Sequence, residues 1–272
     1  MNAHRVDSES KVKLNKLSTD DTGDYDPKDD GKDKAQTRTE ELLEKLATLQ
    51  EQLYANAEQA LLIVLQGMDT SGKDGTIKHV MSGVNPQGCR VTSFKAPSTR
   101  ELGHDFLWRV HQETPPKGYI GLFNRSHYED VLITRVHGLV SDKVAKQRFG
   151  QINDFERLLQ QNGTTVLKFF LHISKDEQRK RLEARIQNPD KRWKFNPTDL
   201  VERKLWPKYL GVYEDAISAT STEQAPWYIV PADYKWYRNL IVAETVVAAL
   251  SAMKLRFPPA PAGIDFDNVR IE

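Results

Sequence analysis

The apolar residues of this chain alternate between short unbroken runs and longer stretches in which they recur every three or four positions. The clearest run is Leu61-Leu62-Ile63-Val64-Leu65, which is typical of a strand covered on both faces. Further strands are predicted at residues 90–94, 119–123, 164–173 and 227–230. Helices are predicted between them, at residues 72–82, 98–111, 141–161, 174–187, 200–218 and 235–256. This alternation predicts one α/β domain with a parallel sheet of about five strands and helices on both faces.

Three segments have the spacing of a capping box: Thr37…Glu40, Ser98…Glu101 and Ser174…Glu177. The first precedes leucines on one helical face, so ordered structure is expected to begin at Thr37. Residues 37–257 are therefore assigned to the domain, residues 1–36 to a polar N-terminal arm and residues 258–272 to a C-terminal tail.

The N-terminal arm is expected to lie outside the core. Residues 1–40 hold 8 Lys and Arg against 10 Asp and Glu, with few apolar positions. Such a segment is either mobile or packed over a neighbour's surface, and a disordered tail without a role is equally compatible with its composition.

Composition excludes several classes of protein. Cys89 is the only cysteine of the 272 residues, so an internal disulfide and a cysteine-based zinc site are both excluded. The apolar runs are far shorter than the roughly 18 residues of a membrane helix, and no secretory signal precedes them. A cytoplasmic protein without a membrane partner is expected. The balance of 39 basic and 38 acidic residues also argues against a general nucleic-acid binder.

A phosphate-binding loop follows the first strand and opens a helix. It reads Gly67-Met68-Asp69-Thr70-Ser71-Gly72-Lys73-Asp74-Gly75-Thr76, whose core has the G-x-x-x-x-G-K spacing. Glycines allow backbone N–H groups to surround phosphate oxygens, and Lys73 adds positive charge beside the helix N-terminus. Gly67 and residues 70–76 are therefore predicted to bind phosphate.

Two carboxylates make this loop unusual. Asp74 occupies the position at which a standard loop has Ser or Thr for Mg²⁺. Asp69 lies inside the loop, where its carboxylate would repel the phosphates that the loop binds. A carboxylate at this place is useful if it binds a metal ion or orients an incoming phosphate. Asp69 is therefore predicted to be a catalytic residue and a metal ligand.

A second set of polar residues follows the predicted strand at 119–123: Asn124-Arg125-Ser126-His127-Tyr128-Glu129-Asp130. Polar groups at the carboxyl ends of parallel strands face the crevice in which ligands bind. Arg125 is predicted to stabilise phosphate charge. Asp130 is the preferred further metal ligand and Glu129 the second choice, whereas His127 is interpreted as a structural residue.

The segment from Lys175 to Lys208 carries 11 basic residues against 6 acidic ones. Two Asn-Pro pairs interrupt its helical pattern and leave a basic loop, Lys191-Arg192-Trp193-Lys194-Phe195. This arrangement is typical of a lid that closes over a polyanion. We predict a lid at about residues 179–200, with Lys191 and Arg192 binding phosphate and Arg185 acting in catalysis.

These stretches resemble the polyphosphate kinase 2 family. The motifs that carry the resemblance are residues 67–76, 123–130 and 191–195, together with Asn85-Pro86-Gln87-Gly88, Ala225-Pro226-Trp227-Tyr228 and Pro231-Ala232-Asp233. The resemblance covers roughly residues 37–257. It implies a three-layer P-loop kinase fold, in which Asp69 and Lys73 are the catalytic loop residues, Arg125 is the Walker B arginine and Arg185 is a lid arginine.

The same resemblance implies transfer of a terminal phosphoryl group between inorganic polyphosphate and a nucleoside mono- or diphosphate. It also implies Mg²⁺, with Mn²⁺ as a second possibility, and a homo-oligomer, either a dimer or a tetramer. Two other readings of the residues stay open: an ATP-dependent kinase for a nucleotide or small molecule, and a nucleotide-dependent switch or nucleic-acid-binding module that uses the basic segment.

Overall fold

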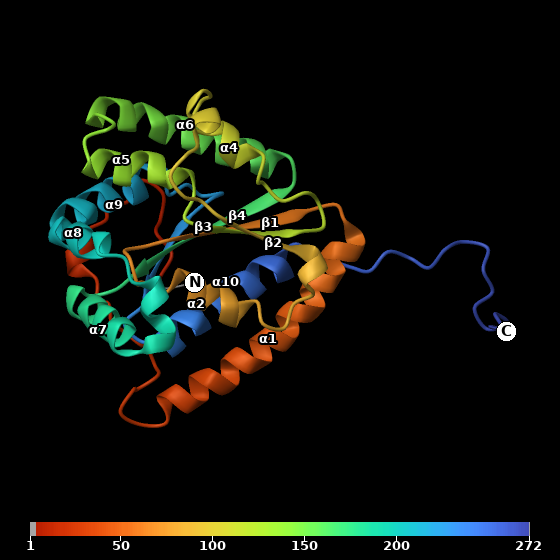
Figure 1. Cartoon of the computed structure of the whole chain (residues 1–272). Helices are drawn as coiled ribbons and strands as arrows, with labels where there is room; N and C mark the ends of the chain where they lie inside the picture. The colour runs from red at the N-terminus through yellow and green to blue at the C-terminus, as the bar shows by residue number, and fades with distance from the viewer. Residues whose placement is uncertain (1–3, 272) are drawn as a thin grey trace.

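The computed structural model describes residues 4–271 and places five parallel strands in one sheet, in the order β2-β3-β1-β4-β5 (Figure 1). The strands are β1 Ala60–Gln66, β2 Cys89–Ser93, β3 Ile120–Asn124, β4 Thr164–His172 and β5 Trp227–Pro231. All five predicted strands are confirmed to within a residue or two at each end. Every residue of central β1 is buried, as expected for a strand covered on both faces.

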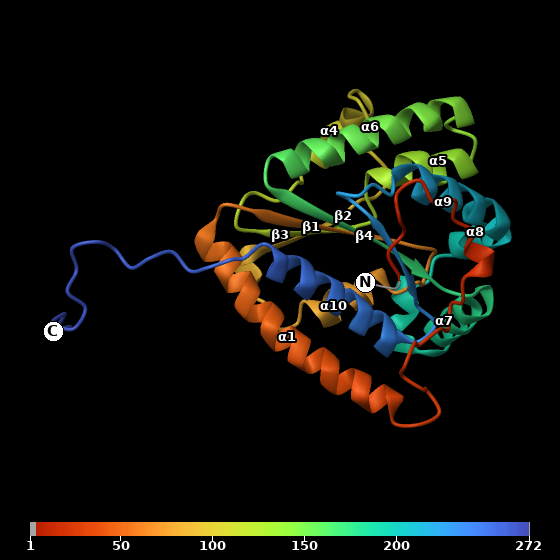
Figure 2. The same cartoon turned by 180° about the vertical axis from the view of Figure 1, so that it is seen from behind.

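Helices cover both faces of the sheet, so the predicted three-layer α/β fold is confirmed (Figures 1 and 2). One face carries α1 Gly31–Asn56, α2 Lys73–Val80 and α10 Lys235–Ala252. The other carries α4 Trp108–His111, α5 Ile133–Val136 and α6 Asp142–Gln161, with α9 Trp206–Thr220 packed beside α6. The lid segment forms α7 Lys175–Gln187, the short 3-10 helix η4 Pro189–Lys194 and α8 Thr198–Lys204, which lie together at one end of the sheet.

The predicted helix starts have different outcomes. At Ser98 both bonds of the capping box form, and α3 Thr99–Leu102 begins there. At Ser174 the hydroxyl caps α7, but the Glu177 carboxylate accepts a bond from Arg181 instead of closing the box. The predicted start at Thr37 is wrong, because α1 already begins at Gly31. Its first turns are stabilised by tertiary contact, since Ala35 is fully buried in the core.

Two long predicted helices are interrupted. The segment 98–111 forms only the short helices α3 and α4, and the segment 200–218 is divided between α8 and α9. Pro207 explains the second division, because proline lacks an N–H and fits the first turn of a helix but not its interior.

Residues 4–30 pack against the domain, so the expectation of a mobile arm, or of one packed on a neighbour, is wrong. Val6, Val12 and Leu14 are buried in the common core. Val6 N donates to Trp227 O and Ile229 N donates to His4 O, so the segment pairs with the outer edge of β5. Pairing removes the unsatisfied backbone groups of an edge strand. A few apolar residues, together with these hydrogen bonds, therefore hold this polar segment to the domain.

The described part of the C-terminal tail, residues 258–271, is exposed and extends away from the domain (Figure 2). Within the described residues, no helix has both the length and the apolar content that crossing a bilayer requires.

Candidate active site

The phosphate-binding loop connects β1 to α2 and contains three residues with positive φ: Gly67, Thr70 and Gly72. Glycine is favoured at position 72 because its φ is 104°, and a Cβ there would also displace the guanidinium of Arg238. Lys73 folds back over the loop, and its Nζ donates to Gly67 O at 2.8 Å and to Met68 O at 3.3 Å. Burial, with a smaller contribution from Arg125, lowers the pKa of Lys73 to about 8. This lysine is therefore held ready beside the position at which the loop would receive a phosphate.

Side chains from α7 and α10 hold the loop backbone from behind. Gln178 Nε2 donates to Asp69 O at 3.0 Å, and Arg181 donates to Thr70 O and Ser71 O at 3.0 and 3.1 Å. Arg238 adds a bond to Ser71 O at 3.3 Å. Arg181 uses its remaining N–H groups on Glu177 and on the carbonyls of residues 232 and 233. The base of the predicted lid is thus bonded to the phosphate loop.

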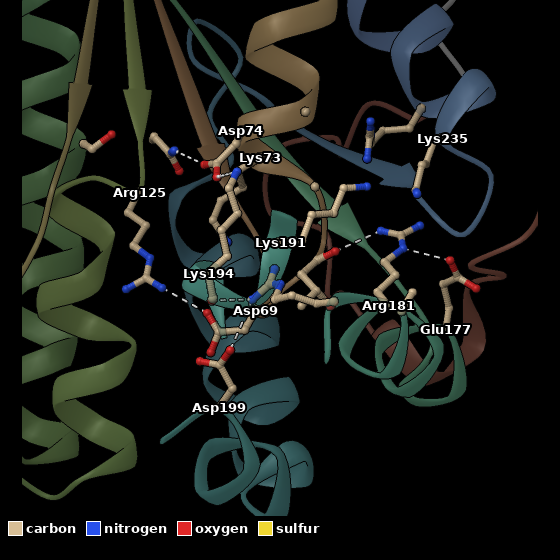
Figure 3. Close-up of a pocket in the computed structure, with 18 of the residues that line it drawn as sticks. Asp69, Lys73, Asp74, Arg125, Glu177, Arg181, Lys191, Lys194, Asp199 and Lys235 are labelled. Atoms are coloured by element: carbon tan, nitrogen blue, oxygen red, sulfur yellow. Dashed lines mark hydrogen bonds and ion pairs between the residues drawn. The ribbon is translucent and has the colours of Figure 1, made fainter. Parts of the chain in front are cut away.

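The two predicted walls of the site meet at one ion pair. Arg125, at the end of β3, has a positive φ of 62° and donates to Asp69 Oδ1 at 3.0 Å (Figure 3). Asn124 Nδ2 donates to Asp74 Oδ1 at 2.6 Å. The Asp74 carboxylate, which replaces the usual hydroxyl, therefore links the loop to the next strand.

A cavity of about 900 Å³ opens above the loop and is strongly cationic. Its basic lining residues are Lys73, Lys95, Arg125, Lys180, Arg181, Arg185, Lys191, Lys194, Lys235 and Arg238. Its acidic ones are Asp69, Asp74, Glu177 and Asp199. Ten cations against four carboxylates favour a polyanionic ligand.

A second cavity of about 180 Å³ lies on the other side of the Asp69–Arg125 pair. Trp206, Tyr209 and Tyr213 form an aromatic wall, and Glu129 and Glu202 add carboxylates. Asp69, Arg125 and Asp199 line both cavities. The ion pair therefore stands where two ligands of different chemistry would meet.

The carboxylates of Glu129 and Asp130, in the turn that follows β3, occupy different environments. Glu129 lines the smaller cavity, and burial raises its pKa against the opposing effect of Arg125 and Lys73. Asp130, the preferred metal ligand, lines neither cavity and instead pairs with Arg109 at 3.5 Å. Both residues belong to the short 3-10 turn η3 His127–Val131, in which Glu129 faces the smaller cavity and Asp130 faces Arg109.

Most of the predicted phosphate-binding residues do reach a cavity. Gly67 lines the smaller one, whereas Thr70, Gly72, Lys73, Asp74, Gly75 and Lys191 line the larger. Ser71, Thr76 and Arg192 line neither. Arg192 points back to α7 and donates to Ile186 O at 2.8 Å. Lys194, rather than Arg192, lines the larger cavity together with Lys191.

Arg185 lines the larger cavity from α7, as predicted. Its guanidinium donates to Lys194 O at 3.0 Å and to Asp199 Oδ2 at 3.4 Å, which joins the lid helix to the basic loop. Asp199 was not singled out from the sequence. It follows an Asn-Pro pair and carries no motif by which it could have been recognised.

No group of three or more His, Cys, Asp or Glu side chains within residues 4–271 surrounds a single point as a metal cage would. Mg²⁺ does not require one, because it is commonly held by one or two carboxylates, water and substrate phosphates. Asp69 and Glu129, which line the same cavity, provide oxygen donors of this kind.

Comparison with known proteins decides the family. Residues 29–258 match the sequence model of polyphosphate kinase 2 (PPK2). The chain belongs to this family. The resemblance of the motifs is thereby confirmed, and the match extends a few residues beyond the range that the motifs indicated.

Two relatives of this polyphosphate kinase 2 chain are similar over almost their whole length. The AMP/ADP-polyphosphate phosphotransferase of Meiothermus ruber is 50% identical over 258 residues, which are 95% of this chain and 96% of the relative. The ADP-polyphosphate phosphotransferase of Rhodopseudomonas palustris is 46% identical over 93% of this chain and 91% of the relative. The crystal structure of polyphosphate kinase 2 from Arthrobacter aurescens TC1 superposes with a TM-score of 0.92 at 41% identity, covering 97% and 93% of the two chains.

Proposed function

We propose that this polyphosphate kinase 2 chain transfers a terminal phosphoryl group, reversibly, between inorganic polyphosphate and a nucleoside mono- or diphosphate, with AMP and ADP as acceptors. The observation that carries the proposal is the pair of cavities that share Asp69 and Arg125, one cationic and the other aromatic and acidic. The names of the relatives, which contain AMP, ADP and polyphosphate, support the choice of substrates.

Polyphosphate occupies the larger cavity in this proposal. The loop amides and Lys73 hold its terminal phosphate, and Lys191 and Lys194 of the lid neutralise units further along the polymer. Arg181 cannot add a donor, because all five of its N–H groups are already bonded within the protein. It supports the loop rather than the substrate.

The nucleotide occupies the smaller cavity, with its nucleoside beside the wall that Tyr209 contributes and its phosphate directed toward Arg125. An oxygen of the acceptor phosphate attacks the terminal phosphorus of polyphosphate, and the bridging P–O bond breaks as the shortened polymer leaves. Arg125 and Arg185 line the cavity in which charge spreads over the transferring group, and they stabilise it. No covalent enzyme intermediate is required.

Asp69 and Glu129 would hold Mg²⁺, or Mn²⁺ with similar oxygen preference, at the boundary between the cavities. The ion would neutralise phosphate charge that the acidic side of the site cannot neutralise by itself. Asp69 also keeps Arg125 in place through their ion pair. The loop carboxylate therefore has a positioning task besides metal binding.

The deciding experiment incubates the protein with polyphosphate, Mg²⁺ and either AMP or ADP, in the absence of ATP. Formation of ADP or ATP is the expected result. No product here, together with turnover of a nucleotide or small molecule by ATP, would replace the proposal with an ATP-dependent kinase. Salt-sensitive binding of RNA or DNA without any turnover would favour a nucleic-acid-binding module.

We further propose that the chain acts in the cytoplasm as a homo-oligomer, a dimer or a tetramer, without nucleic-acid or membrane partners. The single cysteine and the balanced overall charge support this environment. Gel filtration with light scattering of the full chain tests the oligomeric state, and a monomeric mass would overturn it.

A further inference from the structure

A buried charged cluster lies behind the turn that carries Arg125 and Glu129, and the proposed reaction does not use it. Lys168 stands in the middle of β4, paired in register with Val64 on one side and Trp227 on the other. Glu156 reaches it from α6. The Lys168 side chain is 0% exposed and that of Glu156 is 2% exposed. A lysine at the centre of a buried sheet requires an explanation, because desolvating a charge is costly.

The cluster is fully hydrogen-bonded around the Lys168 ammonium group. Its Nζ donates to Glu156 Oε2 at 2.5 Å, to Thr220 O at 2.6 Å and to Tyr128 OH at 3.0 Å. The other carboxylate oxygen of Glu156 accepts from Tyr128 OH at 2.9 Å and from His127 Nε2 at 3.2 Å. One ion pair thus holds two consecutive residues of the turn.

Those two residues lie between the two that face the cavities. Arg125 and Glu129 line the cavities, while His127 and Tyr128 are fully buried on the side of the cluster. Along the chain, the two residues that line the cavities therefore flank a buried stretch that is anchored in the core.

The turn cannot keep this geometry through regular secondary structure. Arg125 has a left-handed φ of 62°, which costs a non-glycine residue free energy. The 3-10 helix that follows, η3, is only five residues long. The Ser126 hydroxyl accepts bonds from Gln66 Nε2 and Tyr128 N, which hold the first part of the turn. Arg148 donates to Asp130 O at 2.8 Å and holds its far end. The side chains in the middle of the turn, His127 and Tyr128, are held by the cluster.

We propose that the Glu156–Lys168 pair is a positioning device that sets the direction of Arg125 and Glu129 through His127 and Tyr128. Stability alone does not account for the pair, because apolar residues of similar volume often replace a buried ion pair without loss of stability. The kinetic test of this inference rests on the proposed function, whereas the hydrogen-exchange test does not.

The first test is the double variant E156L/K168M, which removes both charges and keeps the volume. We expect a folded protein with a lower unfolding temperature, because the buried polar groups of His127, Tyr128 and Thr220 lose a bonding partner. Well below that temperature we expect a fall in kcat of at least about tenfold, since small misplacement of reacting groups is costly. The KM for polyphosphate should stay within about twofold, because the larger cavity is otherwise unchanged. Thr39→Val, a buried replacement in α1 distant from the turn, is the matched control and should retain the wild-type kcat.

A mutant cycle separates positioning from a merely structural role. In the wild type R125A removes an arginine that is correctly placed, so it should cost a larger factor in kcat than it does in the E156L/K168M background. Equal factors in the two backgrounds, or a wild-type kcat in the folded double variant, would overturn the proposal. If the double variant does not fold, Tyr128→Phe takes its place in the cycle, because it removes one bridging hydroxyl and leaves the ion pair intact.

Hydrogen exchange tests the same inference without substrates. Amides of residues 125–131 should exchange at least about tenfold faster in E156L/K168M, or in Tyr128→Phe, while those of α1 keep their protection. Unchanged exchange in the turn would overturn the positioning role. Because this readout does not use turnover, it distinguishes failure of the positioning role from failure of the proposed phosphotransfer.

Discussion

The two cavities on either side of Asp69 differ in both size and chemistry. The larger is lined by ten cations from the loop, the predicted lid, α10 and the ends of β2 and β3, whereas the smaller combines an aromatic wall with several carboxylates. A repeating polyanion can be held by dispersed positive charge in many registers, but a nucleotide has to be held in one orientation. Substitutions in the two cavities should therefore affect the two substrates separately, except at the residues that line both.

Asp69→Asn should have the largest effect, because Asp69 belongs to both cavities. The amide keeps the volume but loses the charge that pairs with Arg125 and that would hold a metal ion. We expect kcat to fall by about 10²–10³-fold or more, comparable to the loss of a principal transition-state interaction. Initial rates at saturating polyphosphate and ADP measure it, and thermal unfolding should show little change. Near-full activity would remove Asp69 from the mechanism.

The next largest effect is expected in the pH dependence of kcat/KM for polyphosphate, which should follow the charge on Lys73. The pKa of this lysine lies at about 8 in the free protein, and only its protonated form attracts phosphate. As pH rises through that value, kcat/KM for polyphosphate should fall, approaching about tenfold per pH unit above it. K73R, whose charge persists at these pH values, should lack this decline even at reduced activity. A wild-type profile that stays flat to pH 9.5, about 1.5 units above that pKa, would contradict the assignment.

Tyr209→Leu should affect the acceptor alone. Loss of an aromatic ring beside a base is expected to raise the KM for ADP by roughly tenfold, and the KM for polyphosphate should not change. Tyr209→Phe is the matched control, since it keeps the ring and removes only the hydroxyl bond to Glu202. Equal increases in both KM values would mean that the cavities do not separate the substrates.

The smallest effects are expected in the lid, where two nearby cations can be compared. Lys194 lines the larger cavity and Arg192 does not. Lys194→Ala should raise the KM for polyphosphate by about three- to tenfold, an effect that high salt reduces, because the lysine is partly exposed. Arg192→Ala should leave this KM within about twofold. If Arg192→Ala proves the more harmful change, the lid adopts another arrangement when polyphosphate binds.

The sheet and the phosphate loop could be predicted from local signals. An apolar run such as residues 61–65 predicts a strand covered on both faces. The G-x-x-x-x-G-K spacing directly after it predicts a phosphate-binding loop, whose two glycines both have positive φ. Asp69, Lys73 and Arg125 were predicted for the same reason. Asp69 and Lys73 belong to the loop and helix start that follow β1, and Arg125 directly follows β3. A parallel sheet brings the carboxyl ends of both strands to one edge.

Residues that act through tertiary contact could not be predicted in this way. Gln178 and Arg238 hold the loop across more than one hundred positions of sequence, and neither belongs to a motif. The choice between Glu129 and Asp130 depends on a single turn, and the choice between Arg192 and Lys194 depends on the direction of one short 3-10 helix. The polar composition of residues 4–30 led to the wrong prediction of an arm outside the core. Three buried apolar side chains and pairing with the edge of β5 hold this segment on the domain.

The layers, the phosphate loop and the prediction of Asp69, Lys73 and Arg125 follow from near-neighbour patterns in the sequence. The bonds from α7 to the loop, the pairing of the N-terminal segment with β5 and the bonds of Glu156 to His127 and Tyr128 are visible only in the folded chain. These features depend on which distant side chains the fold brings within hydrogen-bonding distance. Hydrogen bonds and burial act over a few ångströms of space, whatever the separation along the chain.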